Sequence, residues 1–454
     1  MRMHIATGLS LWVVLIGGCE KKAEAPAEPA AEGTAEAPKT AADTPAAKPD
    51  ASGPVKIGIL HSLSSFMAIS ETSLKDVALM TIEEINEQGG VLGRKLEPVV
   101  VDPASDWPLF AEKARELLEN EKVSVVFGAW TSVSRKSVLP VFEKNNGLLF
   151  YPVQYEGEES SKNVIYTGAA PNQQAIPAVD YLMKEVGVTR WVLEGTDYVY
   201  PRTTNRILEA YLIGKGVPKA DISINYTPFG HSDWQTRVAE IKRFGSAGRK
   251  TAVVSTINGD ANVPFYKELG NQKISAEDIP VVAFSVGEEE LSGLDAKPLV
   301  GHLAAWNYFQ SISTPANKTF IDMWKTYIKN PKRTTNDPME AHYIGFNLWV
   351  KAVEKAKSTS VDAVLAALPG LETPNLTGGI ARMLPNHHIT KPVYIGEVKA
   401  DGQFDIVWKT PGTVPGDAWS DFLAASKPIE ADWVKLKCGN FNTSTKVCSG
   451  QNYK

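Results

Sequence analysis

Short apolar runs alternate with amphipathic segments from residue 55 onward. In the first part of this region four runs read as β-strands: Lys56–Leu60, Val99–Val101, Val123–Phe127 and Leu148–Tyr151. After the first run, Leu74, Val77, Thr81 and Ile85 recur at helical spacing, and Gly89-Gly90 ends that helix. Apolar strands that alternate with amphipathic helices predict an α/β lobe whose parallel sheet is covered on both faces.

The same pattern begins again near residue 175. Four more runs read as strands, namely Trp191–Leu193, Ile222–Tyr226, Ala252–Ser255 and Val281–Phe284, with helical stretches between them. We therefore expect two doubly wound, Rossmann-like α/β lobes. The last third differs. Residues 316–368 read as helical, and Val393–Val398 with Gln403–Trp408 read as a hairpin that turns at Asp401-Gly402.

The N-terminal residues predict export. A charged start precedes a short apolar run, about half of the roughly 20 residues that cross a bilayer. The run ends in Ile16-Gly17-Gly18-Cys19, which resembles the lipobox of bacterial lipoproteins. Residues 1–19 are thus expected to be a lipoprotein signal peptide with Cys19 lipid-modified; the alternative is an ordinary secretory peptide. Residues 20–54 are rich in Ala and Pro and hold no Val, Ile, Leu or aromatic residue, which predicts a disordered tether.

Composition removes several classes of function. The 454 residues include 47 Lys and Arg and 52 Asp and Glu, a formal net charge of −5. The chain therefore lacks the excess of positive charge that would predict nucleic-acid binding. No GxSxG, P-loop, HExxH or CxxC motif occurs, and we expect no cofactor. His387 and His388 are neighbours and would point to opposite faces of a strand, so no metal site is expected. Outside the cytosol, Cys438 and Cys448 are expected to form a disulfide in a tail of residues 431–454.

Polar and aromatic residues gather where the predicted strands end. Four such segments follow strands of the two lobes: Gly128–Ser132, Tyr151–Gly157, Thr196–Pro201 and Asn258–Asp260. Ligands of open α/β sheets bind beyond the carboxyl ends of the strands. The segments therefore predict one binding site shared by both lobes, the alternative being polar loops without a function.

From about residue 55 to 410 the chain resembles the type I periplasmic solute-binding proteins of the branched-chain amino acid and amide class. Within that class it is most similar to the urea-binding receptors of urea ABC transporters; amide sensors share several of the same motifs. The matching stretches are Lys56–Ser64, Val101–Pro108, Trp130–Lys136, Leu149–Gly157, Ala169–Gln173, Asp197–Pro201 and Asp337–Tyr343. The chain departs from the pattern at Ser65-Phe66, where the family usually has glycine-threonine, and this leaves the shape of one pocket wall open.

The resemblance implies two lobes that close on a ligand like a hinged trap. Three crossings are placed near residues 172, 306 and 376. The first lobe then comprises 55–172 and 307–376, and the second comprises 173–306 and 377–430. The closed form would be recognised by ABC permease subunits, with the receptor lipid-anchored on the periplasmic side of the cell envelope.

The resemblance also implies roles for individual residues. Ser132 is expected to hydrogen-bond the ligand, and Trp130 and Tyr151 to sandwich its flat faces. Gln154 can both donate and accept, which suits a ligand with amines on two sides. From the second lobe, Tyr198 would close over the ligand and Asp260 would accept amine hydrogens. None of these groups is an activated nucleophile, so the site is expected to bind urea without reacting.

Other functions stay open at this stage. A receptor for short-chain amides or branched-chain amino acids would share the fold and the transport role. An amide-sensing regulator would more naturally lack the N-terminal export segment. An envelope hydrolase is the remaining alternative, for which the chain offers no activated nucleophile.

Overall fold

The computed structural model describes residues 53–292 and 295–449. They belong to one compact unit that spans Pro49–Lys454. The lipobox, Cys19 and the tether up to residue 52 lie outside the described residues, so the expectations about them stay predictions. In the part of the chain that is described, every helix is too short or too polar to cross a membrane.

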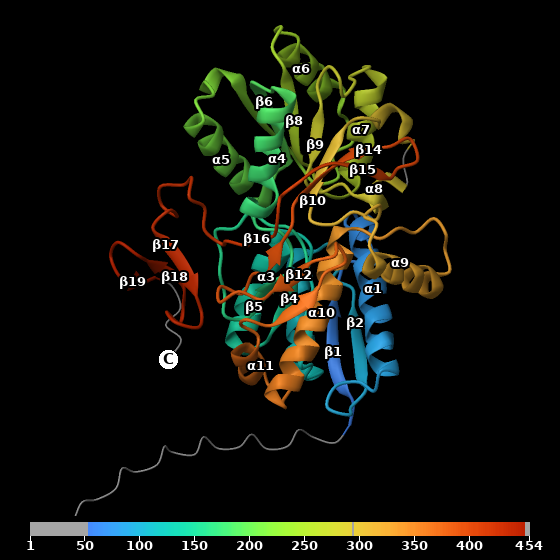
Figure 1. The fold of residues 1–454 in the computed structure, drawn as a ribbon, viewed down its shortest axis with the longest axis vertical. Helices are drawn as coiled ribbons and strands as arrows, with labels where there is room; N and C mark the ends of the chain where they lie inside the picture. Colours follow the sequence, from blue (N-terminus) through green and yellow to red (C-terminus); the bar gives the residue numbers. More distant parts are fainter. Residues whose placement is uncertain (1–52, 293–294, 450–454) are drawn as a thin grey trace, which may run out of the picture. The chain divides into compact units, whose positions relative to one another are not determined.

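A five-stranded sheet forms the first lobe (Figure 1). Its strands lie in the order β2-β1-β3-β4-β5, and each neighbouring pair is parallel. The strands are β1 (Val55–Leu60), β2 (Leu96–Val101), β3 (Val125–Gly128), β4 (Leu149–Tyr151) and β5 (Val164–Tyr166). The sequence predicted the first four of these strands and missed β5.

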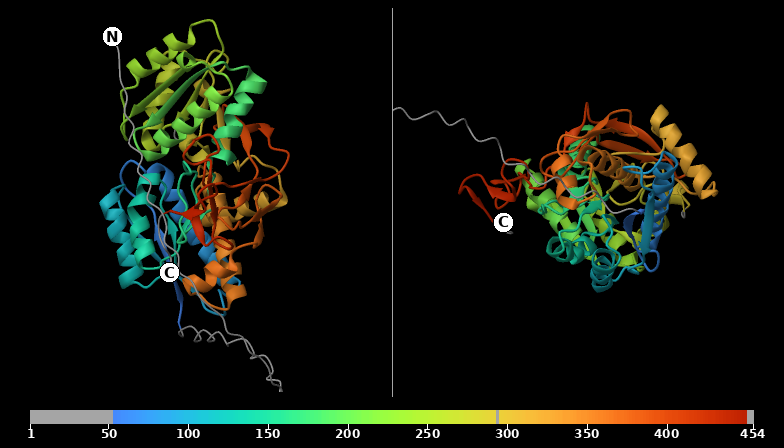
Figure 2. Two further views of the ribbon diagram at one scale, coloured as in Figure 1. Left: turned by 90° about the vertical axis from the view of Figure 1, so that its left-hand side faces the viewer. Right: turned by 90° about the horizontal axis from the view of Figure 1, so that it is seen from below.

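Helices cover both faces of this sheet, as the apolar strands predicted (Figure 2). Neighbouring residues of β3 point to opposite faces: Phe127 stacks on Phe346 of α10, with ring centroids 3.6 Å apart, whereas Val126 packs in the cluster formed with α2 and α3. The helices are α1 (Ala68–Glu87), α2 (Trp107–Arg115), α3 (Ser132–Lys144), α9 (Pro315–Ile328), α10 (Asp337–Ala356) and α11 (Val361–Ala367). A short π-helical turn, Glu116–Asn120, extends α2.

A seven-stranded sheet forms the second lobe, in the order β15-β14-β10-β9-β8-β6-β7. Five strands are parallel, and β14 runs antiparallel to both β10 and β15, which confirms the predicted hairpin. The strands are β6 (Arg190–Thr196), β7 (Ile222–Thr227), β8 (Thr251–Thr256), β9 (Val281–Ala283), β10 (Leu303–Trp306), β14 (Tyr394–Val398) and β15 (Phe404–Lys409). The sequence did not predict β10.

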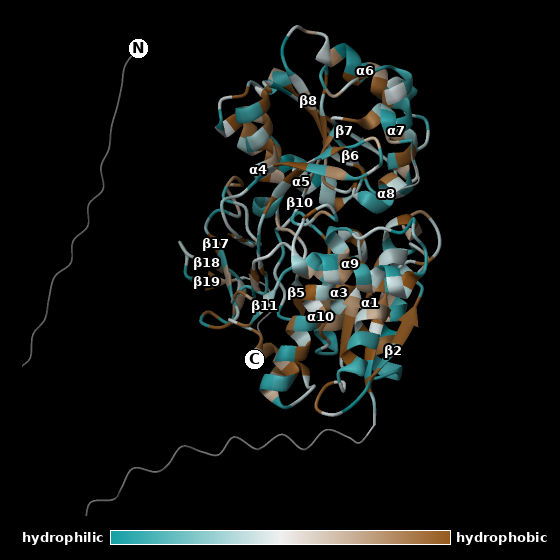
Figure 3. Cartoon of the chain, turned by 45° about the vertical axis from the view of Figure 1, so that its right-hand side comes forward, coloured by the Kyte–Doolittle hydropathy of each residue, from teal (hydrophilic) through white to brown (hydrophobic). Residues whose placement is uncertain are grey.

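Helices again pack on both faces of the second sheet, and apolar colour gathers on the strands beneath them (Figure 3). Val192 and Val253 pack with α6 and α7, whereas Leu193 and Val254 pack with α4 and α5. The helices are α4 (Ala175–Tyr181), α5 (Val199–Gly214), α6 (Gln235–Gly245), α7 (Asn262–Asn271) and α8 (Glu288–Ser292). Short turns lie at Pro171–Gln173, Leu182–Val186, Lys219–Asp221, Gly259–Ala261 and Lys297–Leu299.

The chain passes between the two sheets three times: after β5, after β10 and before β14. Ala381, Met383 and Ile389 pack in the core of the first lobe. We therefore propose that the third crossing lies between Ile389 and Tyr394, rather than near residue 376. The other lobe boundaries stay as proposed from the sequence.

Three small antiparallel sheets complete the described chain. Two pair β11 (Glu372–Pro374) with β12 (Ile380–Arg382) and β13 (Thr390–Lys391) with β16 (Val414–Pro415). The third contains β17 (Ile429–Asp432), β18 (Cys438–Asn442) and β19 (Val447–Cys448). A disulfide joins Cys438 to Cys448 in this C-terminal sheet.

Candidate functional site

The candidate site begins where β3 and β4 of the first lobe end. The chain leaves β3 at Gly128, and the Thr131 hydroxyl accepts a hydrogen bond from the Ser134 N–H at 3.1 Å, which caps α3. Ser132, the first residue of α3, is therefore held at the strand end. The Tyr151 hydroxyl at the end of β4 donates to the carbonyl oxygen of Trp130, so the Tyr151 side chain is tied to the main chain that follows β3.

Ser132 belongs to a buried ionic cluster. Its hydroxyl donates to a carboxylate oxygen of Glu156 and accepts from the Arg135 guanidinium at 3.1 Å. Arg135, which is fully buried, also pairs with Glu156 and with Glu159 and lies 4.7 Å from the centre of the Tyr151 ring. The one hydroxyl hydrogen of Ser132 is therefore committed to Glu156, and a hydrogen bond between a ligand and the hydroxyl or backbone of Ser132 stays a prediction.

Hydrogen bonds join the first lobe to the second at the same place. The Gln154 amide donates to the Ser285 hydroxyl at 2.8 Å, and the Asn258 amide donates to the same hydroxyl at 3.0 Å. The Tyr198 hydroxyl donates to Asn258 at 3.0 Å. Gln154 and Tyr198, which the sequence assigned to opposite walls of one site, are thus connected through two residues of the second lobe.

In the strand-end segments of the two lobes, three buried polar atoms have no hydrogen-bond partner: Nε1 of Trp130, Oε1 of Gln154 and the hydroxyl of Tyr200. Their residues are 2%, 3% and 2% exposed. Burial raises the pKa of the Tyr200 phenol well above its usual value, so this hydroxyl stays protonated. Buried polar groups are nearly always paired, so one N–H, one amide oxygen and one hydroxyl in these segments stand out from the rest of the core.

Aromatic rings from both lobes flank this cluster. The Phe66 ring of the first lobe lies 5.1 Å from the Phe229 ring of the second, and Phe229 lies 4.7 Å from Tyr198. Phe66 is the residue at which the chain departs from the family pattern. The structure places it in an aromatic contact between the lobes, and its second neighbour is Trp107 at 5.9 Å.

Asp260 is the predicted site residue that lies apart from the others. Its side chain is exposed, and its N–H donates to the carbonyl oxygen of Phe66 at 3.3 Å. No hydrogen bond links its carboxylate to the cluster around Tyr151 and Gln154 among the described residues. The structure therefore brings together Trp130, Ser132, Tyr151, Gln154 and Tyr198, but not Asp260.

Four residues of the cluster were not predicted from the sequence: Glu156, Tyr200, Asn258 and Ser285. A signal for them was present, because Glu156, Tyr200 and Asn258 lie in the strand-end segments and Ser285 follows β9. What the sequence does not give is the direction of each side chain.

The histidine pair lies elsewhere and its rings face different neighbours. His388 stacks on Tyr166 at 4.7 Å and its ring nitrogen lies 2.6 Å from the Tyr155 hydroxyl, whereas His387 stacks on Trp433 at 5.7 Å. Burial lowers the pKa of His388 to about 4 and that of His387 to about 3, so both rings are neutral at pH 7. In the described ranges no group of three or more acidic, His or Cys side chains is arranged to hold a metal ion.

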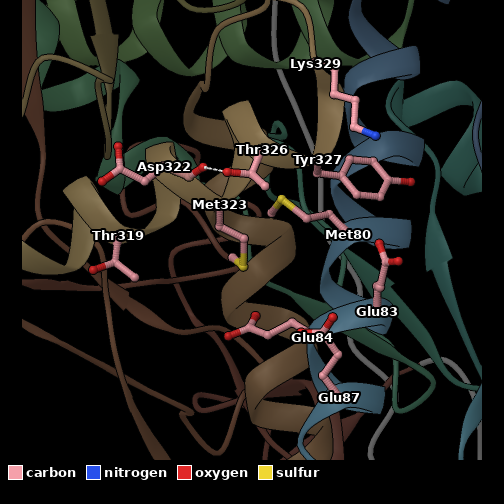
Figure 4. A pocket seen from close by; sticks show the side chains of 10 residues that line it. All are labelled: Met80, Glu83, Glu84, Glu87, Thr319, Asp322, Met323, Thr326, Tyr327 and Lys329. Atoms are coloured by element: carbon pink, nitrogen blue, oxygen red, sulfur yellow. Dashed lines mark hydrogen bonds between the residues drawn. The ribbon is translucent and has the colours of Figure 1, made fainter.

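A separate cavity of about 790 Å³ lies between α1 and α9 (Figure 4). Met80 and Met323 line it together with acidic side chains that include Glu84 and Asp322. Its lining residues lie on α1, on α9 and at Lys329 just after α9, and none of them belongs to the strand-end segments. This cavity is therefore distinct from the candidate site.

Comparison with known families gives one match that covers most of the chain. The family described as "Periplasmic binding protein domain" matches residues 55–425. The Leu/Ile/Val-binding protein of Escherichia coli K12 is 22% identical over 344 residues, which are 71% of this chain and 88% of that protein. A solute-binding protein of an ABC transporter from Rhodopseudomonas palustris HaA2, solved with p-hydroxybenzoic acid, is 20% identical with a TM-score of 0.70, covering 82% of this chain and all of that one. At this identity the likeness shows the fold.

A limonene hydroxylase of Geobacillus stearothermophilus is 32% identical over 123 residues. The match covers 27% of this chain and only 22% of that protein. So short a match says nothing about a hydroxylase activity here.

Proposed function

Because the chain belongs to the periplasmic binding protein family, we propose that it is the substrate-binding component of an ABC transporter and that its ligand is urea. The receptor captures urea between its two lobes and delivers it to permease subunits in the membrane. Lobe closure around a ligand is a common switching motion, and it makes the closed form a signal of occupancy.

The observation that carries the proposal is the set of unpaired buried atoms on Trp130, Gln154 and Tyr200. Urea is planar and neutral, with one carbonyl acceptor and four N–H donors. The Trp130 N–H suits the carbonyl, and the Gln154 oxygen and the Tyr200 hydroxyl suit the amines. Each group left unpaired in a closed site costs about 1–3 kcal/mol, so a ligand that pairs all three is favoured over an apolar molecule that pairs none.

Receptors of amino acids and aromatic acids share this fold, and their ligands carry a carboxylate. Two arginines lie near the strand ends here. Arg202 is exposed and pairs with Asp197 at 2.6 Å, and the guanidinium of Arg135 donates to Glu159, Ser132 and Glu156. Neither arginine is free to receive a carboxylate, which supports a neutral ligand. A receptor for short-chain amides is the second candidate, because the same three atoms suit acetamide.

We propose that the site binds its ligand without reacting. The Ser132 hydroxyl donates to Glu156, and Glu156 in turn pairs with Arg135, so both groups are engaged in the buried ionic cluster. Calorimetric titration with urea, acetamide, formamide, leucine and p-hydroxybenzoate tests the ligand. We expect heat with urea and none with leucine or p-hydroxybenzoate; binding of either of the latter alone refutes the urea proposal. Ammonia released from urea refutes the proposal that the protein is not an enzyme.

The same proposal places the receptor on the periplasmic side of the envelope, held by a lipid at Cys19. One acyl chain binds membranes only marginally, whereas several anchor a protein stably. Cys19→Ala is expected to move the protein from the membrane fraction to the soluble envelope fraction. Unchanged membrane association of this variant refutes the anchor.

A further inference from the structure

A buried ionic cluster lies directly behind the candidate ligand site. Arg135 is fully buried, and its guanidinium donates to Glu159 at 2.7 Å and to Glu156 at 3.3 Å. Lys136 adds a half-exposed cation, 2.6 Å from Glu159 and 3.7 Å from Glu156. Two cations therefore balance two carboxylates, as the cost of burying charge requires.

Glu156 is the carboxylate of this cluster that reaches the site. It accepts the hydroxyl hydrogen of Ser132, and Arg135 donates to the same hydroxyl from the other side. Glu159 lies farther back, held by Arg135, Lys136 and the Tyr166 hydroxyl. Without the charge of Glu156, Arg135 keeps Glu159, at 2.7 Å, as its ionic partner, and Ser132 faces a cluster with one negative charge fewer.

The influence of Glu156 extends to the second lobe. Burial raises the pKa of both Tyr198 and Tyr200, and the Glu156 carboxylate raises each of them further. The same carboxylate acts on Tyr151 of the first lobe. At Tyr151 the opposite effect of Arg135 is larger, so a ligand held among these three tyrosines lies within the field of both Glu156 and Arg135.

We propose that Glu156 is the specificity-determining residue that makes the site reject anions. Its carboxylate takes the hydroxyl hydrogen of Ser132, is a second ionic partner of Arg135 besides Glu159 and repels a ligand carboxylate, while it tolerates neutral or positively charged ligands that carry N–H groups. The inference rests on the proposed function, because it explains why an amide would be chosen over the carboxylates that bind to proteins of similar fold.

Three small planar molecules of different charge test this inference: guanidinium, urea and acetate. Their dissociation constants are measured by calorimetry, or by competition with urea, on the full chain at pH 7 for the wild type and for Glu156→Gln. Glutamine keeps the size of the side chain and an oxygen for Ser132 but removes the charge. Glu158→Gln is the matched control, because Glu158 lies two residues along the same loop and instead accepts from Ser420 and Ser426.

We expect Glu156→Gln to strengthen acetate binding and weaken guanidinium binding, each by about tenfold or more, with a smaller change for urea. Opposite changes for the two ions cannot come from general damage to the fold. Glu158→Gln should leave the order of the three ligands as in the wild type. Parallel losses for all three ligands in Glu156→Gln would show a purely structural role and overturn the inference.

The wild type provides a test that does not depend on the variant folding. Acetate that binds the wild type as tightly as urea overturns the inference and leaves the urea proposal standing. A wild type that binds neither urea nor acetamide refutes the proposed function, and the inference with it.

Discussion

At the scale of single residues, two tyrosines of the candidate site that are two positions apart differ in their hydrogen bonds. Tyr198 precedes α5 and donates to Asn258, whereas Tyr200 lies in the first turn of α5 with a buried hydroxyl that has no partner. Under the proposed function, the first hydroxyl stabilises the protein and the second binds the ligand. This difference predicts different effects of removing each hydroxyl.

Tyr200→Phe is expected to weaken urea binding about 5- to 150-fold, because one of the three free polar atoms is lost. Its midpoint of thermal unfolding should change less than that of Tyr198→Phe, since the Tyr200 hydroxyl has only weak interactions with Ser285 and Gln154. Tyr198→Phe should instead lower the thermal midpoint, because the Asn258 oxygen loses its donor. Calorimetry and thermal unfolding on both variants decide the matter. Equal urea affinity of Tyr200→Phe and the wild type contradicts the assignment of Tyr200 to the site.

The residues of the site could be foreseen from sequence only up to a point. Trp130, Tyr151 and Tyr198 follow apolar strands, and the rule that ligands bind at strand ends selects them. Asp260 obeys the same rule, yet its side chain is exposed because the short turn at Gly259–Ala261 directs it away from the cluster. The bonds from Ser285 to Gln154 and Asn258 depend on how the lobes dock, which no local pattern encodes.

At the scale of elements, hydrophobic pattern predicted most strands but missed β5 and β10. β5 has only three residues and follows a long loop rather than a helix, so the alternation of strands and helices does not mark it. β10 reads Leu-Ala-Ala-Trp, and alanine has low strand propensity. Both strands form because their neighbours in the sheets, β4 and β9, supply a parallel edge.

The short helix α8 carries three consecutive buried glutamates, and each has a different environment. Glu289 pairs with Arg333 at 3.0 Å, and Glu290 accepts from Ser70 of α1 at 2.7 Å. Glu288 accepts only a backbone N–H from Gln310, and its second oxygen has no partner. Burial, with smaller contributions from Glu290 and Asp337, raises the pKa of Glu288 to about 8.

This pKa predicts a loss of stability as the pH rises. Between about pH 4.5 and pH 8 the unfolded chain releases the Glu288 proton while the folded chain retains it, so the free energy of unfolding falls across this window. The fall amounts to several kcal/mol, at about 1.4 kcal/mol for each pH unit. Glu288→Gln should flatten the curve and raise the stability at pH 8. Urea and guanidinium are both ligands in the proposals above, so unfolding is driven by heat across pH 5–8.

The exposed Glu112→Gln on α2 is the control for this measurement and should retain the slope of the wild type. A Glu288→Gln curve that runs parallel to that of the wild type would show that Glu288 is ionised in the folded protein.

At the scale of the whole described chain, the two lobes touch through polar and aromatic contacts. Arg333 bridges Asp76 of α1 at 3.3 Å and Glu289 of α8 at 3.0 Å, and Ser70 of α1 bonds Glu290 of α8. Gln154 and Ser285 meet at the site itself, and Phe66 meets Phe229 beside it. The family resemblance of the sequence implied that the two lobes close on a ligand. It did not predict any of these contacts.

Phe66 gives the last prediction, because its aromatic contact with Phe229 links the lobes without touching the free polar atoms of the site. An aromatic pair contributes about 0.5–1.5 kcal/mol beyond the burial of its area. If a ligand binds the closed form, every contact that stabilises this form increases the apparent affinity for the ligand. Phe66→Ala should therefore weaken urea binding about 2- to 12-fold while each hydrogen bond to urea stays available.

Small-angle scattering distinguishes weaker closure from other causes. Without urea, the variant should have a larger radius of gyration than the wild type. At saturating urea, its radius should return to the wild-type value. Val407→Ala, an exposed change on β15, is the control and should alter neither affinity nor radius. If Phe66→Ala binds urea as tightly as the wild type, the contact between Phe66 and Phe229 does not contribute to closure.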